Sequence, residues 1–123
     1  MIQSRDQSLD TLLALDGETF VVDNAGEHWV KFEVKLCDVT PERPHGLRYS
    51  LTLHARDGTR LVGFDNAHAV PAGSGPGARQ RAAHDHSHRL RTVRPYDYAD
   101  APSLLMDFWQ MVDAVLDEKG VKR

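Results

Sequence analysis

The stretch Val30-Lys31-Phe32-Glu33-Val34-Lys35-Leu36 alternates apolar and charged side chains without a break. In an extended chain successive side chains point to opposite faces, so this period of two predicts a strand with one buried surface and one solvated surface. The side chains predicted to face inward are Val30, Phe32, Val34 and Leu36. The turn-forming residues 23–27 precede this stretch and follow the apolar residues 20–22, which predicts a hairpin.

A second alternating stretch, 47–54, places Arg48, Ser50, Thr52 and His54 on its outer side. Asp57-Gly58 predicts a tight hairpin turn that leads into a returning strand at 60–64. One further strand is expected over 88–94, ended by Pro95. The segment 71–77, rich in Gly and Pro, predicts a loop, and residues 9–13 fit either a short helix or the start of a strand.

Residues 102–118 predict the clearest helix. Asp100 or Ser103 can cap its start, Pro102 suits its first turn, and Gly120 follows its end. Trp109 lies beside the apolar stripe and is interpreted as a packing residue. The predicted stripe is Leu105, Phe108, Val112, Val115 and Leu116.

These patterns predict one α+β domain over residues 1–123: an antiparallel sheet of four to five strands with a C-terminal helix packed on one face. No apolar run approaches the roughly 18 residues of a membrane span. The N-terminal residues do not resemble a secretory signal, and the single cysteine, Cys37, excludes an internal disulfide framework. A cytoplasmic location is therefore expected.

Charge is distributed unevenly along the chain, whose net charge is −3. Residues 43–94 hold nine arginines, no lysine and three acidic residues, which gives +6, together with six of the seven histidines. Arginine forms forked contacts with phosphate and carboxylate groups. Solvated loop charges are the alternative interpretation, but their coincidence with histidine favours an anion-binding surface.

Three histidines lie within His84-Asp85-His86-Ser87-His88, downstream of the polar stretch Phe64-Asp65-Asn66-Ala67-His68. If the first stretch is extended, its three histidines share one face with neighbours roughly 6.5–7 Å apart. The spacing suits a zinc site made by His84, His86 and His88, with His68 or Asp65 as a ligand from elsewhere.

Acid–base cleavage of RNA without a metal is the leading hypothesis. This chemistry needs a base for the 2′-hydroxyl, an acid for the leaving oxygen, and cations beside the phosphate. His68, His86 and His88 are the predicted proton-transfer residues; Asp65 orients an imidazole, and Asn66 holds the loop or donates to a phosphate. The predicted phosphate-binding residues are Arg48, Arg79, Arg81, Arg89 and Arg91. No cofactor is required by this hypothesis.

The two polar stretches 64–68 and 84–88, followed by a Val-bearing strand and a terminal helix, resemble the TumE-like toxin family over about residues 12–116. The resemblance implies a small bacterial toxin paired with an antitoxin that carries a helix-turn-helix domain. RNA cleavage is the commonest activity of small toxins of this kind, so the resemblance agrees with the Arg and His pattern.

Two alternatives stay open. One is a non-enzymatic module that binds nucleic acid or a metal, and the other is an enzyme that modifies nucleotides, although no nucleotide-binding loop is recognisable. The expected partners are RNA and the cognate antitoxin, without membrane association; a homodimer is a further hypothesis. A strand edge or the Arg/His face is the expected antitoxin-binding surface.

Overall fold

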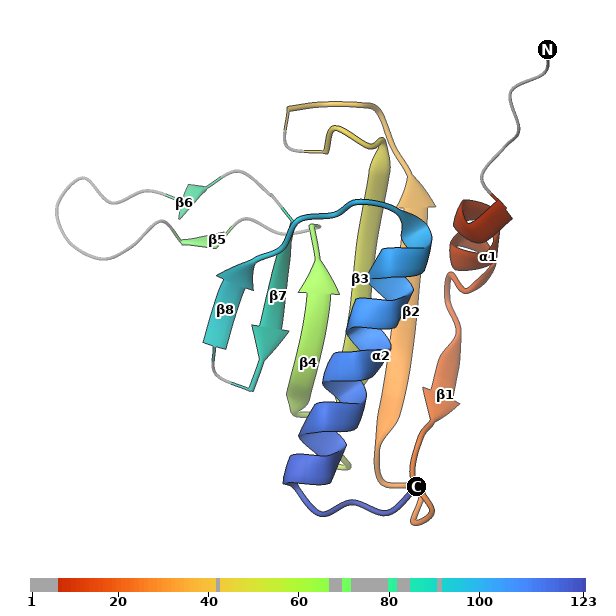
Figure 1. Ribbon diagram of the computed structural model, residues 1–123, viewed down its shortest axis with the longest axis vertical. Helices are drawn as coiled ribbons and strands as arrows, with labels where there is room; N and C mark the ends of the chain where they lie inside the picture. The colour runs from red at the N-terminus through yellow and green to blue at the C-terminus, as the bar shows by residue number, and fades with distance from the viewer. Residues whose placement is uncertain (1–6, 42, 67–69, 72–79, 82–84, 91) are drawn as a thin grey trace, which may run out of the picture.

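The computed structural model describes residues 7–41, 43–66, 70–71, 80–81, 85–90 and 92–123. Its main feature is a six-stranded antiparallel sheet with strand order β1-β2-β3-β4-β7-β8 (Figure 1). These strands are β1 Thr19–Val21, β2 Trp29–Leu36, β3 Leu47–His54, β4 Arg60–Asp65, β7 His86–Arg89 and β8 Thr92–Pro95. A separate two-stranded ribbon is formed by β5 Val70–Pro71 and β6 Gln80–Arg81.

The α+β architecture with a C-terminal helix on one face is confirmed, but the predicted count of four to five strands is wrong. The expected single strand over 88–94 is divided into β7 and β8 by a tight turn at Leu90. Leu90 has a φ of 53°, the left-handed conformation that is common in the tight turns of β-hairpins. Leucine carries no turn signal, so periodicity alone could not locate this turn. Pro71 was also assigned to a loop, whereas it lies in β5.

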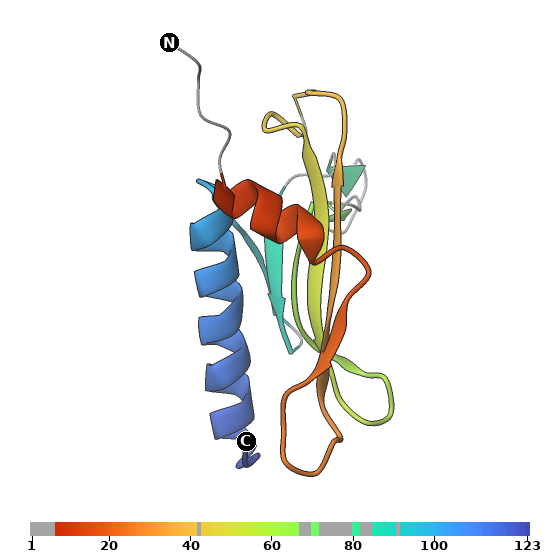
Figure 2. The same ribbon diagram turned by 90° about the vertical axis from the view of Figure 1, so that its right-hand side faces the viewer.

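Helix α2, Ala101–Glu118, covers one face of the sheet, and Figure 2 shows it alongside the strands. Asp100 is the N-cap, and its carboxylate accepts a 2.8 Å bond from the backbone N–H of Ser103. Gly120, with a φ of 70°, follows its C-terminal end. The stripe was predicted correctly except at one position, because Leu104 is buried and Leu105 only partly so.

The core lies between α2 and the inward face of β2, β3 and β4. Phe32, Phe64 and Phe108 meet edge to face with ring centroids 5.6 and 6.0 Å apart, and Trp109 packs on Phe32 and Phe108 as expected. Leu36 was predicted to face inward but is 61% exposed. Strand β1 pairs only with residues 29–31 of β2. The C-terminal end of β2, where Leu36 lies, is therefore an edge of the sheet.

The segment whose secondary structure the sequence left undecided is helical: α1, Gln7–Ala14, packs on α2 and β2 and buries Leu12 completely. Both helices therefore lie on the same side of the sheet (Figure 2). The opposite face carries Lys31, Arg48, Thr52 and His54, as the alternation predicted. No helix of the described part of the chain covers this polar face.

Candidate functional site

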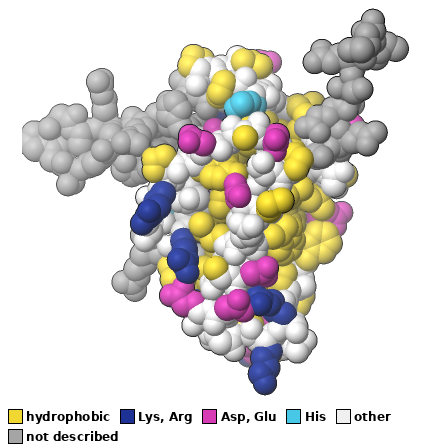
Figure 3. Space-filling model, in the orientation of Figure 1, with side chains coloured by type: hydrophobic (Ala, Val, Ile, Leu, Met, Phe, Trp, Pro, Cys, Tyr) yellow, Lys and Arg dark blue, Asp and Glu magenta, His cyan; other side chains and the backbone are white. Residues whose placement is uncertain are grey.

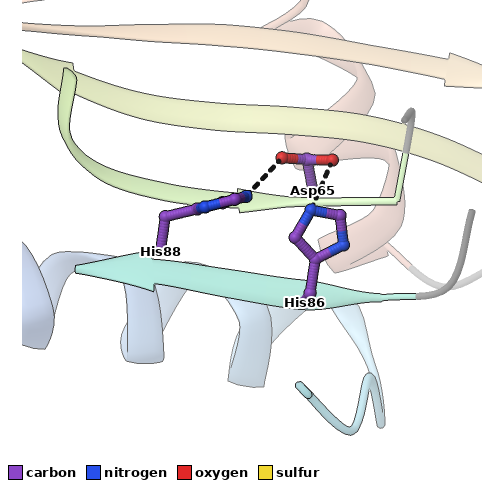
Figure 4. A group of neighbouring side chains, drawn as sticks. All are labelled: Asp65, His86 and His88. Atoms are coloured by element: carbon purple, nitrogen blue, oxygen red, sulfur yellow. Dashed lines mark ion pairs between the residues drawn. The ribbon is translucent and has the colours of Figure 1, made fainter. Parts of the chain in front are cut away.

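Two adjacent strands place the site on the polar face of the sheet. Val62 and Phe64 of β4 are buried toward α2, so Gly63 and Asp65 face the other way. In the antiparallel register, Asp65 lies opposite His86 and Gly63 lies opposite His88. The period of two and this register together direct Asp65 and both imidazoles to one side (Figure 4).

The carboxylate of Asp65 lies between the two imidazoles. Its Oδ1 is 3.3 Å from Nε2 of His86, and its Oδ2 is 3.5 Å from Nε2 of His88. The two rings meet edge to face with centroids 4.7 Å apart. Asp65 is 2% exposed and His86 5% exposed, whereas the side chain of His88 is 12% exposed. A buried carboxylate is strongly destabilising unless it is paired, so the two imidazoles are its compensating partners.

Arg60 fixes the hydrogen position on His88. Its Nη2 lies 3.1 Å from Nδ1 of His88, and a guanidinium can only donate. Nδ1 is therefore the acceptor, which leaves the ring hydrogen on Nε2, directed at Asp65. The three side chains form one chain of polar contacts in which Arg60 faces His88 and His88 faces Asp65.

Gly63 provides the space for this arrangement. A side chain at this position would place its Cβ 3.2 Å from Cδ of Arg60 and 3.5 Å from Cδ2 of His88. The first of these distances is tighter than ordinary van der Waals contact. A residue with a side chain here would require Arg60 to shift by a few tenths of an ångström beside His88.

Asn66 ties the end of β4 to β3. Its Oδ1 accepts a 2.9 Å bond from the backbone N–H of Tyr49, and its Nδ2 donates a 2.7 Å bond to the carbonyl of Leu47. Its own carbonyl accepts from Nε of Arg43 at 3.1 Å. Of the two roles expected for Asn66, these contacts support the one in which it holds the loop.

A second, partly buried contact supports β7 from the α2 side of the sheet. The hydroxyl of Tyr49 donates a 2.7 Å bond to Oδ2 of Asp85, the residue before β7. Burial is the main cause that raises the pKa of the Tyr49 hydroxyl far above its usual value, and the negative charge of Asp85 is the second cause. Tyr49 therefore stays a donor and helps to hold the strand that carries both histidines.

Asp65, His86 and His88 can also hold a metal ion, because one ligand atom from each lies within 4.8 Å of the others. Two imidazoles and one carboxylate form a donor set suited to zinc. His84, part of the predicted metal set, lies outside the described residues, and Asp65 takes its place beside His86 and His88.

Comparison with known families decides the class of protein. The family model described as Toxin TumE matches residues 14–116. The chain belongs to the TumE toxin family. Membership makes it a toxin-family protein and implies an antitoxin partner, as the sequence resemblance suggested. No curated protein and no solved structure shows a significant match. No helix in the described ranges is long and apolar enough to cross a membrane.

In this TumE family member the predicted arginines do not all reach the histidines. Arg89 lies on the α2 side of the sheet, where its guanidinium pairs with Glu118. Arg48 is exposed on the polar face. Arg81 lies in β6. The remaining predicted residues fall outside the described part of the chain: His68, His84, Arg79 and Arg91.

Arg60 and Gly63 were missed by sequence reasoning. Alternation from Asp65 through Gly63 would put Arg60 on the side of α2. A β-bulge between Leu53 and His54 shifts the register, so that Arg60 pairs with His54 and shares the polar face. No residue pattern in β4 signals that bulge.

The α2 side of the molecule differs in charge from the polar face. Figure 3 shows acidic and hydrophobic side chains over this face, with Lys and Arg side chains at its left edge and its lower end. Helix α2 contains no basic residue, and its acidic residues are Asp107, Asp113, Asp117 and Glu118. Three of these four carboxylates pair with Arg89 or Arg123.

Proposed function

We propose that this toxin cleaves RNA by acid–base catalysis on the polar face of the sheet. The observation that carries the proposal is the contact of one buried carboxylate, Asp65, with two imidazoles beside an arginine. The 2′-oxygen of a ribose attacks the adjacent phosphorus, and the bond to the 5′-oxygen of the next nucleotide breaks. A cyclic phosphate and a 5′-hydroxyl are formed, so one base and one acid suffice.

His88 is the proposed base. In the unliganded protein Arg60 occupies the acceptor position of Nδ1. A phosphodiester offers the guanidinium anionic oxygens, which bind it more strongly than a neutral imidazole does. When Arg60 moves to the phosphate, Nδ1 is able to take the 2′-hydroxyl proton. Asp65 holds the Nε2–H and stabilises the resulting imidazolium.

His86 is the proposed acid, which protonates the leaving 5′-oxygen. Arg60 stabilises charge on the phosphate, and Arg48 extends the cationic surface along β3. Asn66 is a positioning residue in this scheme, because its side-chain oxygen and nitrogen both form hydrogen bonds with the backbone of β3. We retain His68, Arg79 and Arg81 as proposed contributors, and leave Arg89 out because it faces α2.

The test is growth arrest on expression and cleavage of a defined RNA oligonucleotide in EDTA. His86→Ala and His88→Ala are expected to relieve the arrest and abolish cyclic-phosphate products. His45→Ala is the matched control, because this exposed imidazole lies against Tyr98, outside the Asp65 contacts. Circular dichroism and urea unfolding establish that each variant is folded. Full toxicity and cleavage in both site variants would contradict the proposal.

A toxin that binds RNA without cleaving it is the alternative. The exposed cations of the polar face, Arg48 and Arg60, favour it independently of the histidines. In that case the RNA is retained intact, and His86→Ala and His88→Ala leave its affinity unchanged. Substituting both arginines with methionine would weaken binding for every RNA sequence.

We propose that the partner is an antitoxin with a helix-turn-helix domain that covers the polar face. Toxin-family membership supports the existence of an antitoxin, and the basic 43–94 segment supports an acidic surface on it. Co-expression of the neighbouring gene should suppress growth arrest. Loss of complex formation on Arg48→Glu, with unchanged stability, would support this surface.

A further inference from the structure

The Asp65–His86–His88 cluster brings three possible metal ligands together. Zinc binds nitrogen and oxygen ligands at about 2.0–2.1 Å, so two ligand atoms of a tetrahedral site lie about 3.3–3.4 Å apart. The two contacts of the Asp65 carboxylate measure 3.3 and 3.5 Å. Both exceed the usual N–H···O hydrogen-bond length of about 2.9–3.0 Å. The two contacts run to different oxygens of the carboxylate, and one ligand atom from each residue lies within 4.8 Å of the others. Small movements of the side chains would therefore bring the three ligand atoms to the spacing of a zinc site.

Burial and chemistry favour a transition metal over magnesium or calcium. Asp65 and His86 are almost fully buried, so the ligands lose little freedom when an ion binds. Two imidazoles suit zinc, whereas magnesium and calcium prefer oxygen ligands. Three protein ligands leave one tetrahedral position for water or another donor.

Arg60 opposes the ion. A neutral imidazole that binds metal through Nε2 must carry its hydrogen on Nδ1, and ligating histidines usually donate that hydrogen to an acceptor. In this protein Nδ1 of His88 accepts from Arg60 instead. Zinc binding therefore requires Arg60 to leave His88, and the guanidinium charge adds a repulsion.

We propose that Asp65, His86 and His88 form an inhibitory zinc site gated by Arg60. The inhibitory part rests on the proposed function, because a His88 that binds zinc through Nε2 carries its hydrogen on Nδ1, and that nitrogen can then no longer accept the 2′-hydroxyl proton. Arg60 on His88 keeps the site in its metal-free form. Zinc on the three ligands holds the toxin inactive, and a chelator restores it.

Direct metal binding tests the site without any RNA. Titration of the metal-free full-length protein with Co²⁺, followed by visible absorption, and with Zn²⁺, followed by calorimetry, should give one ion per chain. Asp65→Asn, which keeps the shape of the side chain, should remove this ion. His86→Ala, as a separate variant, should also remove it. His45→Ala is the control for an exposed histidine and should leave binding unchanged. Retention of the ion in both site variants would overturn the metal site.

Arg60→Met tests the gate, because it keeps the aliphatic stem and removes the donor and its charge. It should tighten zinc binding about tenfold or more, as expected for removing a hydrogen bond to a charged group. Equal or weaker binding would overturn the gating role. Arg48→Met, on the same face, is the matched control and should change the affinity little.

Cleavage assays then separate this inference from the proposed function. One equivalent of zinc should inhibit wild-type cleavage, and EDTA should restore it. Cleavage that requires zinc would overturn the inhibitory role. If no preparation cleaves RNA, the proposed function fails, while one zinc that is lost in Asp65→Asn still supports the site.

Discussion

Asn66→Ala is the most direct test of how the site is held. The asparagine is 2% exposed, and its amide pairs with the N–H of Tyr49 and the carbonyl of Leu47. The substitution leaves one buried donor and one buried acceptor without these partners. Each unsatisfied group costs about 1–3 kcal/mol, so the loss is about 2–6 kcal/mol. The backbone bond from Asn66 N–H to Tyr49 is retained, which favours the lower half of that range.

Urea unfolding followed by circular dichroism measures this loss. With a denaturant slope of about 2 kcal/mol/M, a loss of about 2–4 kcal/mol should lower the midpoint by about 1–2 M. Asn24→Ala is the matched control, because Asn24 is the only other asparagine of the chain and is exposed in a turn. A surface substitution of this kind should change the free energy of unfolding by less than about 0.5 kcal/mol.

A change below about 0.5 kcal/mol in Asn66→Ala would refute the reasoning, because a buried amide that holds two backbone groups cannot be neutral. If such a stable variant also lost toxicity, Asn66 would act on the RNA. That outcome would favour phosphate donation, the other role that the sequence suggested for Asn66, over its role in holding β4 against β3.

Three further predictions concern the supports of the fold. Tyr49→Phe removes the donor to the Asp85 carboxylate and should cost about 1.5–3 kcal/mol in urea unfolding, together with reduced toxicity from a displaced β7. A hydrogen bond from the Lys35 side chain lowers the pKa of Asp16 below its usual 3.8, and a second hydrogen bond from the backbone N–H of Val34 lowers this pKa further. The stabilisation from Asp16 is therefore complete at pH values above 3.8 and is lost as the pH falls through the lowered pKa. The difference in free energy of unfolding between wild type and Asp16→Asn should shrink between pH 5 and pH 3. Asp100→Ala removes the N-cap of α2 and should cost about 1 kcal/mol in thermal unfolding, and no change would mean that another group caps the helix.

The elements that were predicted well are those whose signal is local. The alternation over residues 30–36 and 47–54 predicts two strands and their polar face, and both are observed as β2 and β3. The helix ends follow from Asp100 and Gly120, which act on their nearest neighbours. The hairpin at Asp57-Gly58 is likewise confirmed between β3 and β4.

The strand count and the composition of the site depended on pairing instead. The left-handed residue that divides β7 from β8 is Leu90, which no local propensity marks. Proximity in sequence suggested that Arg89 joins the histidines, but its position in β7 directs it to α2. Successive side chains of a strand point to opposite faces of the sheet, so the side chain of Arg89 lies on the other face from that of its neighbour His88.

The sequence by itself determined that Asp65, His86 and His88 lie on polar, alternating or turn-bounded stretches within a basic segment. This follows because side-chain direction in a strand is a local property. Only the tertiary structure decided that Asp65 lies opposite His86 and that Arg60 reaches His88. The register of β4 on β7, which joins segments far apart in the chain, sets the first contact. The bulge in the β3–β4 hairpin sets the second, and both depend on backbone pairing that the residue pattern of β4 alone does not show.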